Sequence, residues 1–217
     1  MLAHAFSRLF ACALLALASI GFAAAQQTPL REKVDYIAIS PQPVAAGNRI
    51  EVIEFFWYGC PHCYNLQPAL DAWLKRKPAD VDFKRIPAAF RDSWLPHARI
   101  YYTLETLGEL ERLHHAVFAA LHQNKETLMT ANATADWAAR NGIQPTQWLT
   151  AYNSPEVTRK VDASKAQTQA YAVPGTPSLV VDGRYLTSSG MAESMPGVIQ
   201  NLEGLIVLAR DRRGATR

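Results

Sequence analysis

The chain has 217 residues, of which 49% are hydrophobic and 19% are charged, and its formal net charge is +3. This length suits one compact domain, or one domain with an insertion, and supplies enough apolar residues for a core. Because the net charge is small and no basic run contains interleaved aromatic residues, we predict that the protein binds no nucleic acid.

The N-terminal segment, residues 1–25, is typical of a cleaved signal peptide. Arg8 supplies a positive charge, Leu9 to Phe22 is almost entirely apolar, and Ala23 to Ala25 provides small residues for cleavage. An uncleaved membrane anchor is the weaker interpretation, because the apolar stretch is short and no stop-transfer pattern follows. We therefore expect this segment to be removed on export, and Cys12 to be lost with it.

The next part of the chain predicts a polar lead-in and then a strand–helix–strand unit. A short edge strand is expected at residues 36–39. The strand from Ile50 to Trp57 is apolar on both faces except at two glutamates, as expected for a central strand of a parallel sheet. A helix with a buried apolar stripe is predicted from Pro61 to Arg76, and a second strand from Val81 to Ile86.

From about Ser93 to Tyr171 the pattern is helical with short breaks. Helices are predicted at Leu95–Leu107, at Leu110–His122, from a cap at Thr134 to Asn141, at Pro145–Tyr152, and from a cap at Ser154 onward. A strand at Ser178–Val181, a turn at Asp182-Gly183 and a strand at residues 184–186 then form a hairpin, and a helix from Pro196 to Arg210 follows. The order of elements is βαβ, a run of helices, and ββα.

Cys60 and Cys63 are separated by Pro61 and His62 at the start of the first predicted helix. A cysteine at a helix N-terminus meets unpaired backbone N–H groups and the positive end of the helix dipole, and both lower its pKa. Pro61 suits the first helical position, where no N–H is needed. The spacing places both sulfurs on one helical face, close enough for a small disulfide ring. We therefore predict a redox-active disulfide, with Cys60 as the exposed nucleophile and Cys63 buried one turn further in.

Two other interpretations of the cysteine pair carry less weight. A zinc site needs two further ligands at matching spacing, and the histidines at positions 97, 114, 115 and 122 do not provide them. A purely structural disulfide that closes so short a loop would stabilise the fold little. A C-x-x-C pair in a βα pattern favours redox chemistry, and we predict neither a metal nor a cofactor.

Glu54 is a carboxyl group in the middle of the apolar strand, before Cys60 in the chain. Burial there would raise its pKa and let it pass protons to or from Cys63. The alternative is a side chain whose carboxylate reaches water, because glutamate is rarely fully buried. Its basic partner on the next strand is expected to be either Lys84 or Arg85.

With these elements in place, the chain closely resembles the DsbA family of thiol:disulfide oxidoreductases. The resemblance rests on four segments: Glu54-Phe55-Phe56, Cys60-Pro61-His62-Cys63-Tyr64, Val173-Pro174-Gly175-Thr176-Pro177 and Asp182-Gly183-Arg184-Tyr185. It implies an α/β thioredoxin fold, formed by residues 26–90 and 164–217, with an inserted all-helical domain at residues 91–163. Trp57 to Gly59 and Thr176 stand at positions that vary within the family, where they are expected to tune substrate preference and redox poise.

The resemblance further implies a periplasmic oxidase. Such a protein donates its Cys60–Cys63 disulfide to reduced, unfolded exported proteins, is reoxidised by a DsbB-like membrane partner, and acts as a monomer. The peptide bond before Pro177 is expected to be cis and to lie beside the disulfide, which leaves the backbone of Thr176 free to pair with an extended substrate. His62 is expected to stabilise the Cys60 thiolate through its ring N–H or its positive charge.

The aromatic residues beside the motif, Trp57, Tyr58 and Tyr64, together with Met191, are candidates for an apolar surface that receives unfolded polypeptides. The pair His114-His115 lies in the inserted helices and is interpreted as a solvated helix face.

Two other functions stay open at this point. A disulfide isomerase or reductase would share the fold, although residues 26–48 are too short for the dimerisation domain that such isomerases carry. A polypeptide-binding chaperone would use an apolar groove, with incidental cysteines. A reduction potential well above that of thioredoxin would favour the oxidase.

Overall fold

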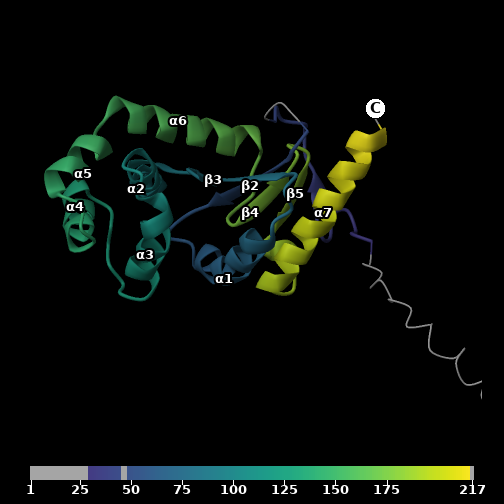
Figure 1. Cartoon of the computed structure of the whole chain (residues 1–217), viewed down its shortest axis with the longest axis horizontal. Coiled ribbons are helices and arrows are strands. Elements are labelled where there is room, and N and C mark those ends of the chain that lie inside the picture. Colours follow the sequence, from purple (N-terminus) through teal and green to yellow (C-terminus); the bar gives the residue numbers. More distant parts are fainter. Residues whose placement is uncertain (1–28, 45–47, 216–217) are drawn as a thin grey trace, which may run out of the picture.

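The computed structural model describes residues 29–44 and 48–215, so the predicted signal peptide lies outside the described residues. Strands β1 (Ile37–Ala38), β2 (Ile50–Phe56), β3 (Val81–Pro87), β4 (Ser178–Val181) and β5 (Tyr185–Ser188) form a sheet in the order β1-β5-β4-β2-β3. β2 runs parallel to β3 and antiparallel to β4, so the sheet is mixed (Figure 1). The strand that leads to Cys60 is therefore central, as predicted.

Two helices cover one face of this sheet (Figure 1). α1 (Pro61–Arg76) begins directly after Cys60, and α7 (Met195–Ala215) packs beside it on an apolar cluster shared with β2 and β4. α1 has its predicted bounds, because Pro61 occupies the first helical position and Lys77, which precedes Pro78, leaves the helical conformation. Within the described residues, no helix is both long and apolar enough to cross a membrane.

The β4–β5 hairpin brings the start of β4 to the active-site end of β2. Asp182 and Gly183 form its predicted turn, and both have positive φ values, 53° and 62°. The turn also includes Arg184, which was predicted to begin the next strand, and Asp and Gly suit the turn because both tolerate positive φ. Since β4 is antiparallel to β2, Ser178 pairs with Phe55. The residues just before Ser178 therefore lie beside those just after Phe55.

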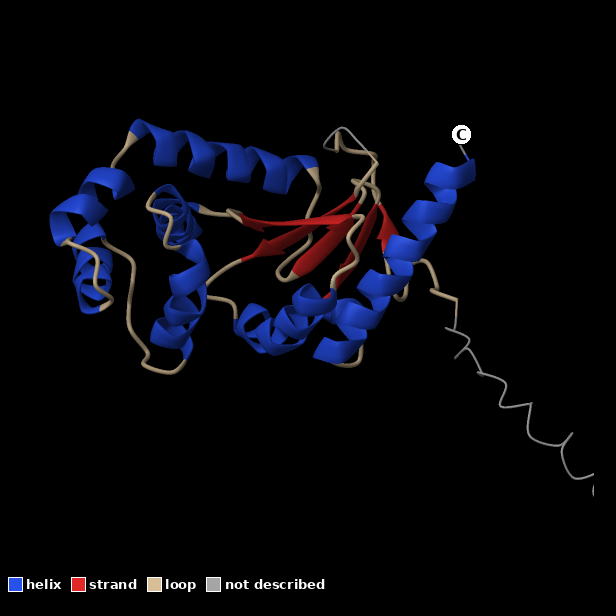
Figure 2. Ribbon diagram, in the orientation of Figure 1, coloured by secondary structure: helices blue, strands red, loops and turns tan. Residues whose placement is uncertain are grey.

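The chain between β3 and β4 is helical, as predicted. It forms a short 3-10 helix η1 (Asp92–Trp94), then α2 (Leu95–Thr106), α3 (Leu110–His122), α4 (Ala131–Arg140), α5 (Pro145–Tyr152) and α6 (Pro155–Ala170). A second 3-10 helix, η2 (Ser189–Met191), lies between β5 and α7. Helices α2 to α5 gather at one end of the sheet, and α6 returns from them toward it (Figures 1 and 2). α6 passes residue 163 without a break and ends at Ala170.

The start of α4 corrects one prediction. The cap is Thr130, whose side chain accepts a hydrogen bond from Ala133 N–H at 3.2 Å. Thr134 lies inside the helix and is buried, where its hydroxyl accepts from Trp148 Nε1 at 3.0 Å and donates to Ala131 O at 2.8 Å. The local pattern offers two threonines at helical spacing, and only the packing of α5 against α4 decides between them.

The residues around the cysteines belong to the core of the helical block. Phe56, Tyr58, Cys60 and Cys63 join one buried cluster with apolar residues of α2 to α6, among them Phe118. A separate cluster holds α1 and α7 against the sheet. The cysteine pair therefore lies where the sheet meets the helical block.

Candidate active site

Cys60 is the residue immediately before α1, and its extended backbone lets the helix begin at Pro61. A hydrogen bond of 2.9 Å from Cys60 N–H to Trp57 O closes the turn that carries it. Cys63 is fully buried, whereas Cys60 keeps 7% of its surface exposed. The prediction that Cys60 is exposed is therefore wrong, because most of this residue is buried. Cys60 is the more accessible of the two cysteines, but the shared core and Thr176, two residues before β4, cover most of it.

The two thiols have opposite pKa shifts. The pKa of Cys60 is lowered to about 5, first by a hydrogen bond from the Cys63 thiol, and then, against the effect of burial, by the Thr176 side chain and the backbone N–H groups at the start of α1. The pKa of Cys63 is raised well above its ordinary value, first by burial and then by the hydrogen bond and charge of Cys60. At neutral pH the pair therefore holds a thiolate at Cys60 and a thiol at Cys63.

Thr176 and Pro177 stand directly beside Cys60, because β4 begins beside the end of β2. The Thr176–Pro177 peptide bond is cis. The Cys60 thiol donates to Thr176 O at 3.2 Å. That carbonyl favours the protonated sulfur, whereas the Thr176 side chain favours the thiolate. Thr176 thus acts on the sulfur from both its backbone and its side chain.

Glu54 is fully buried on β2, and its partner is Arg85. The two residues form a pair in the β2–β3 register, and Arg85 Nε donates to Glu54 Oε2 at 2.9 Å. Lys84 projects from the opposite face of β3 and pairs with Glu51 at 2.8 Å. Burial raises the pKa of Glu54, and the charge of Arg85 only partly offsets it. The alternative of a carboxylate in water is thereby excluded.

Gln67, which was not predicted as a site residue from the sequence, connects Glu54 to the active-site helix. Its side-chain nitrogen donates to Cys63 O at 3.1 Å and lies 3.4 Å from Glu54 Oε1. Gln67 is buried one helical turn after Cys63. The signal available in the sequence is this i, i+4 spacing on α1, which places the amide on the face that meets β2.

The aromatic residues beside the motif have different environments. Tyr58 is fully buried, and its hydroxyl lies 2.9 Å from His114 Nδ1. His114 is also buried, which lowers its pKa well below the ordinary value, whereas His115 is exposed and pairs with Asp71 at 3.1 Å. The expectations of a surface role for Tyr58 and a solvated His114 are therefore wrong, because the helical block packs over the turn.

His122 of α3 contacts the motif on both sides and was not singled out from the sequence. Its Nε2 donates to Tyr58 O at 2.8 Å, since a carbonyl oxygen can only accept. Its ring stacks on Tyr64, with centroids 4.9 Å apart. The helical block therefore contacts Tyr58, within the turn that leads to Cys60, and Tyr64, the residue after Cys63.

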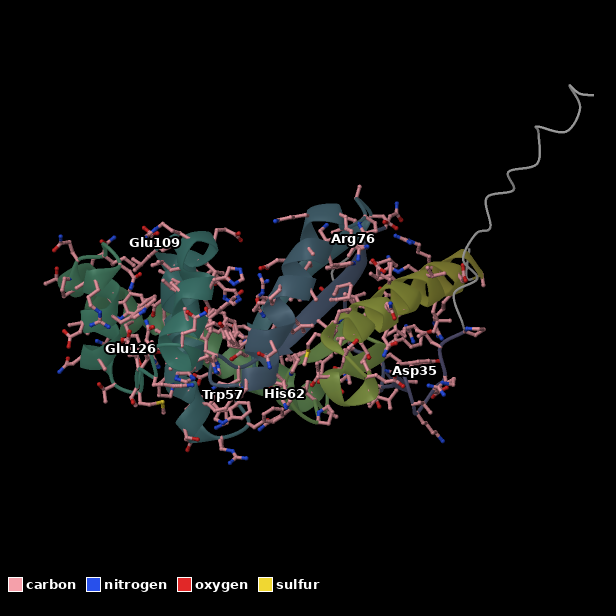
Figure 3. All side chains as sticks on the ribbon, turned by 90° about the horizontal axis from the view of Figure 1, so that it is seen from below. Asp35, Trp57, His62, Arg76, Glu109 and Glu126 are labelled. Carbon is pink, nitrogen blue, oxygen red and sulfur yellow. The ribbon has the colours of Figure 1, made fainter. Side chains whose placement is uncertain are left out.

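Pro61 and His62 are exposed at the start of α1, so the dipeptide between the cysteines is open to partners. Figure 3 shows His62 at this end of the helix, with Trp57 on the side toward the helical block. Within the part of the chain that the structure describes, no group of three or more His, Cys, Asp or Glu side chains is arranged to hold a metal ion.

Comparison with known proteins identifies the family of this chain. The model of the DSBA-like thioredoxin domain matches residues 83–200. The thiol:disulfide interchange protein DsbA of Burkholderia cepacia is 43% identical over 175 residues, which are 80% of this chain and 82% of that protein. DsbA of Pseudomonas aeruginosa is 39% identical over 181 residues, or 83% and 86% of the two chains.

Solved structures show the same fold. The crystal structure of Pseudomonas aeruginosa DsbA superposes with a TM-score of 0.78 at 36% identity, and the match covers 84% of this chain and 95% of that one. The oxidoreductase DsbA from Xylella fastidiosa gives a TM-score of 0.75 at 32% identity, over 82% and 96% of the chains. The predicted thioredoxin fold with a helical insertion is confirmed. The chain therefore belongs to the DsbA family of thiol:disulfide oxidoreductases.

Proposed function

We propose that this protein oxidises reduced, unfolded proteins after their export to the periplasm, by donating its Cys60–Cys63 disulfide. The observation that carries the proposal is the geometry of the pair, with Cys60 immediately before α1 and Cys63 fully buried one turn further. In this arrangement the pKa of Cys60 is lowered to about 5 and that of Cys63 is raised. A stabilised thiolate favours the reduced protein, so its disulfide readily accepts electrons from a substrate.

The exchange proceeds in two steps. A substrate thiolate attacks Cys60 Sγ, the bond between the enzyme sulfurs breaks, and Cys63 leaves with the electron pair. A second substrate thiolate then attacks the substrate sulfur of the mixed disulfide, and Cys60 leaves as a thiolate. The substrate gains a disulfide and the enzyme gains two electrons. The low pKa of Cys60 makes it the better leaving group in the second step.

We assign Glu54 to proton transfer at Cys63. The departing Cys63 sulfur needs a proton, because burial raises its pKa. The buried Glu54 carboxyl keeps its own proton to a higher pH than an exposed glutamate does, and its charge acts on Cys63. Gln67 holds the carboxyl and the Cys63 backbone in place. Glu54 thus gives the proton in the forward reaction and takes it back on reoxidation.

Thr176 and Pro177 are proposed to receive the substrate. The half-buried Thr176 lies next to Cys60, two residues before β4, where an extended polypeptide can pair with its backbone. His62 is exposed at the same end of α1 and is proposed to favour the thiolate.

The remaining parts of the proposal concern the cell. Residues 1–25 direct export and are cleaved, the mature protein acts as a monomer, and a DsbB-like membrane protein reoxidises Cys60 and Cys63. We further propose that residues 26–90 and 164–217 form the thioredoxin-like domain and residues 91–163 the inserted one. The buried cluster that holds α1 and α7 against the sheet draws on no residue of 91–163, which supports this division.

The test is to purify the chain from residue 26 onward, measure its reduction potential against glutathione, and follow disulfide formation in a reduced, unfolded protein. We expect a potential well above the roughly −270 mV of thioredoxin, and stoichiometric oxidation of the substrate. Cys63→Ser should trap the mixed disulfide on Cys60. A potential close to that of thioredoxin would assign the protein to the reductases instead.

A further inference from the structure

The turn that carries Cys60 is held by a side chain of the helical block. Trp57 O accepts a hydrogen bond from Cys60 N–H at 2.9 Å, so Tyr58 and Gly59 are the two central residues of the turn. Tyr58 is fully buried, and its carbonyl oxygen lies 2.8 Å from Nε2 of His122. Figure 1 shows α3, which carries His122, beside α1. The turn before Cys60 is therefore tied to a helix that contains neither cysteine.

This hydrogen bond has a fixed direction. A carbonyl oxygen can only accept, so the imidazole of His122 must carry a proton on Nε2. Among the residues that the structure describes, His122 is the one hydrogen-bond donor to Tyr58 O. A buried carbonyl without a donor is unfavourable, so loss of the imidazole should allow the turn to change its conformation.

The conformation of the turn affects both sulfurs. Cys60 has an extended backbone directly before α1, and the N–H groups of His62 and Cys63 contribute to lowering its pKa. At the other end of the turn, the N–H of Trp57 acts in the same direction on the pKa of Cys63. Hydrogen bonds weaken steeply when they depart from linear geometry. A displaced turn should therefore stabilise both thiolates less well.

The imidazole of His122 is itself held in place. It stacks on the ring of Tyr64, with centroids 4.9 Å apart and planes at 11°. Phe118 of the same helix lies beside both rings, with centroid distances of 6.1 Å to His122 and 6.2 Å to Tyr64. The Tyr64 hydroxyl accepts a hydrogen bond from Gln123. A ring packed in this way directs its N–H at the turn with little further loss of side-chain entropy.

We propose that His122 is a positioning residue for disulfide exchange, because its hydrogen bond to Tyr58 O holds the turn that directs Cys60 Sγ to the start of α1. This role rests on the proposed function, since it concerns the exchange at Cys60. A purely structural His122 would act through its stack on Tyr64 alone. Loss of its donor would then lower the melting temperature and leave the ionisation of Cys60 unchanged.

The experiment titrates Cys60 of the reduced mature protein by thiolate absorbance in three variants. His122→Phe keeps a ring that can stack on Tyr64 and removes the donor. His122→Gln removes the ring and keeps an N–H donor at the same number of bonds from the backbone. His115→Phe is the matched control, because His115 is an exposed histidine on the same helix that pairs with Asp71 and not with the turn.

The donor should decide the outcome. In His122→Phe we expect the Cys60 transition to move up by about 0.3–1 pH unit, which is the two- to tenfold change expected of one hydrogen bond. The equilibrium constant for oxidation of glutathione by the protein should fall by a similar factor. His122→Gln should restore most of both values, and His115→Phe should leave both equal to those of the wild type.

One measurement needs no variant and applies even if His122→Phe does not fold. Nitrogen-15 NMR of the wild-type reduced protein at about pH 8, where an ordinary histidine is neutral, should show a proton on Nε2 of His122. A neutral ring with its proton on Nδ1 would exclude the hydrogen bond to Tyr58 O and overturn the inference.

Three titration results would also overturn it. These are an unchanged Cys60 transition in folded His122→Phe, an equal shift in His115→Phe, and no recovery in His122→Gln. A wild-type protein that exchanges with glutathione and oxidises no polypeptide would instead contradict the proposed function. The titrations would still decide the role of His122 in that case, because they require no polypeptide substrate.

Discussion

Arg85 Nε donates to Glu54 Oε2 at 2.9 Å, from the neighbouring position of the parallel β2–β3 pair. The carboxyl is fully buried, and Gln67 ties its other oxygen to the active-site helix. The site therefore holds a buried acid on the strand behind Cys63 and a nucleophilic sulfur, Cys60, at the start of the helix. This arrangement assigns proton transfer and nucleophilic exchange to different residues.

Cys60 should ionise well below neutral pH. Thiolate absorbance of the reduced protein should show a transition near the pKa of about 5, because the Cys63 thiol and the start of α1 stabilise the charge. Cys60→Ser should remove this transition, whereas Cys63→Ala, which removes the hydrogen bond to the thiolate, should retain it at a higher pKa. Titration of Cys60 near the unperturbed value of about 8.5 would contradict the oxidase.

The reduced protein should be more stable than the oxidised protein at neutral pH. With a folded pKa of about 5 against about 8.5 unfolded, the Cys60 thiolate contributes roughly 2–3 kcal/mol at about pH 7. The disulfide, which closes a loop of about four residues, stabilises by only about 2 kcal/mol. The thiolate contribution is fully present above the unfolded pKa and is lost as pH falls through the folded pKa. Denaturant melts should therefore show the order of stability inverting between about pH 5 and about pH 7, and an oxidised form that is more stable at every pH would exclude this balance.

His62→Pro should make the protein a weaker oxidant without unfolding it. The substitution removes an N–H that stabilises the Cys60 thiolate, in the first turn of α1 where proline is tolerated. We expect the pKa of Cys60 to rise and the reduction potential to fall by about 30 mV, the equivalent of one charge-assisted hydrogen bond. His62→Ala, which keeps the N–H, separates the backbone effect from that of the ring. A potential equal to the wild-type value would show that His62 does not tune the site.

Glu54→Gln should slow disulfide exchange at Cys63. General acid–base catalysis contributes about 10²–10⁴-fold, so we expect a loss of at least about tenfold in rate. Burial raises the pKa of Glu54, so the wild-type rate should fall as pH rises through that pKa, and the variant should lack this dependence. Glu51→Gln is the matched control, because Glu51 is a buried glutamate on the opposite face of the same strand. Stopped-flow rates that fall equally in both variants would indicate a structural role only.

Tyr58 and His114 should be energetically coupled. Tyr58→Phe or His114→Phe alone leaves a buried polar group without its 2.9 Å partner, and each should cost about 1–3 kcal/mol. The double variant should cost less than the sum, with a coupling of about 0.5–3 kcal/mol in denaturant melts. Burial also lowers the pKa of His114, so its contribution to stability should decline as pH falls below about 6.5. Strictly additive costs would show that the two side chains act independently.

Local signals in the sequence determined the elements that carry the site. Pro61 at the first helical position predicted the start of α1, and Pro78 beyond its last turn predicted its end. Asp182-Gly183 predicted the hairpin turn. The same start of α1 placed Cys60 at the helix N-terminus and Cys63 one turn further. These features depend on residues only a few positions apart, and their conformational preferences are strong enough to act without the rest of the fold.

The tertiary structure decided which distant groups meet. Strand register selected Arg85 rather than Lys84 for Glu54, because neighbouring residues of β3 point to opposite faces. Packing of α3 over the turn buried Tyr58 and His114 and reduced the exposure of Cys60. The sequence alone could not show these contacts, since each joins segments separated by tens of residues and depends on how two buried surfaces fit together.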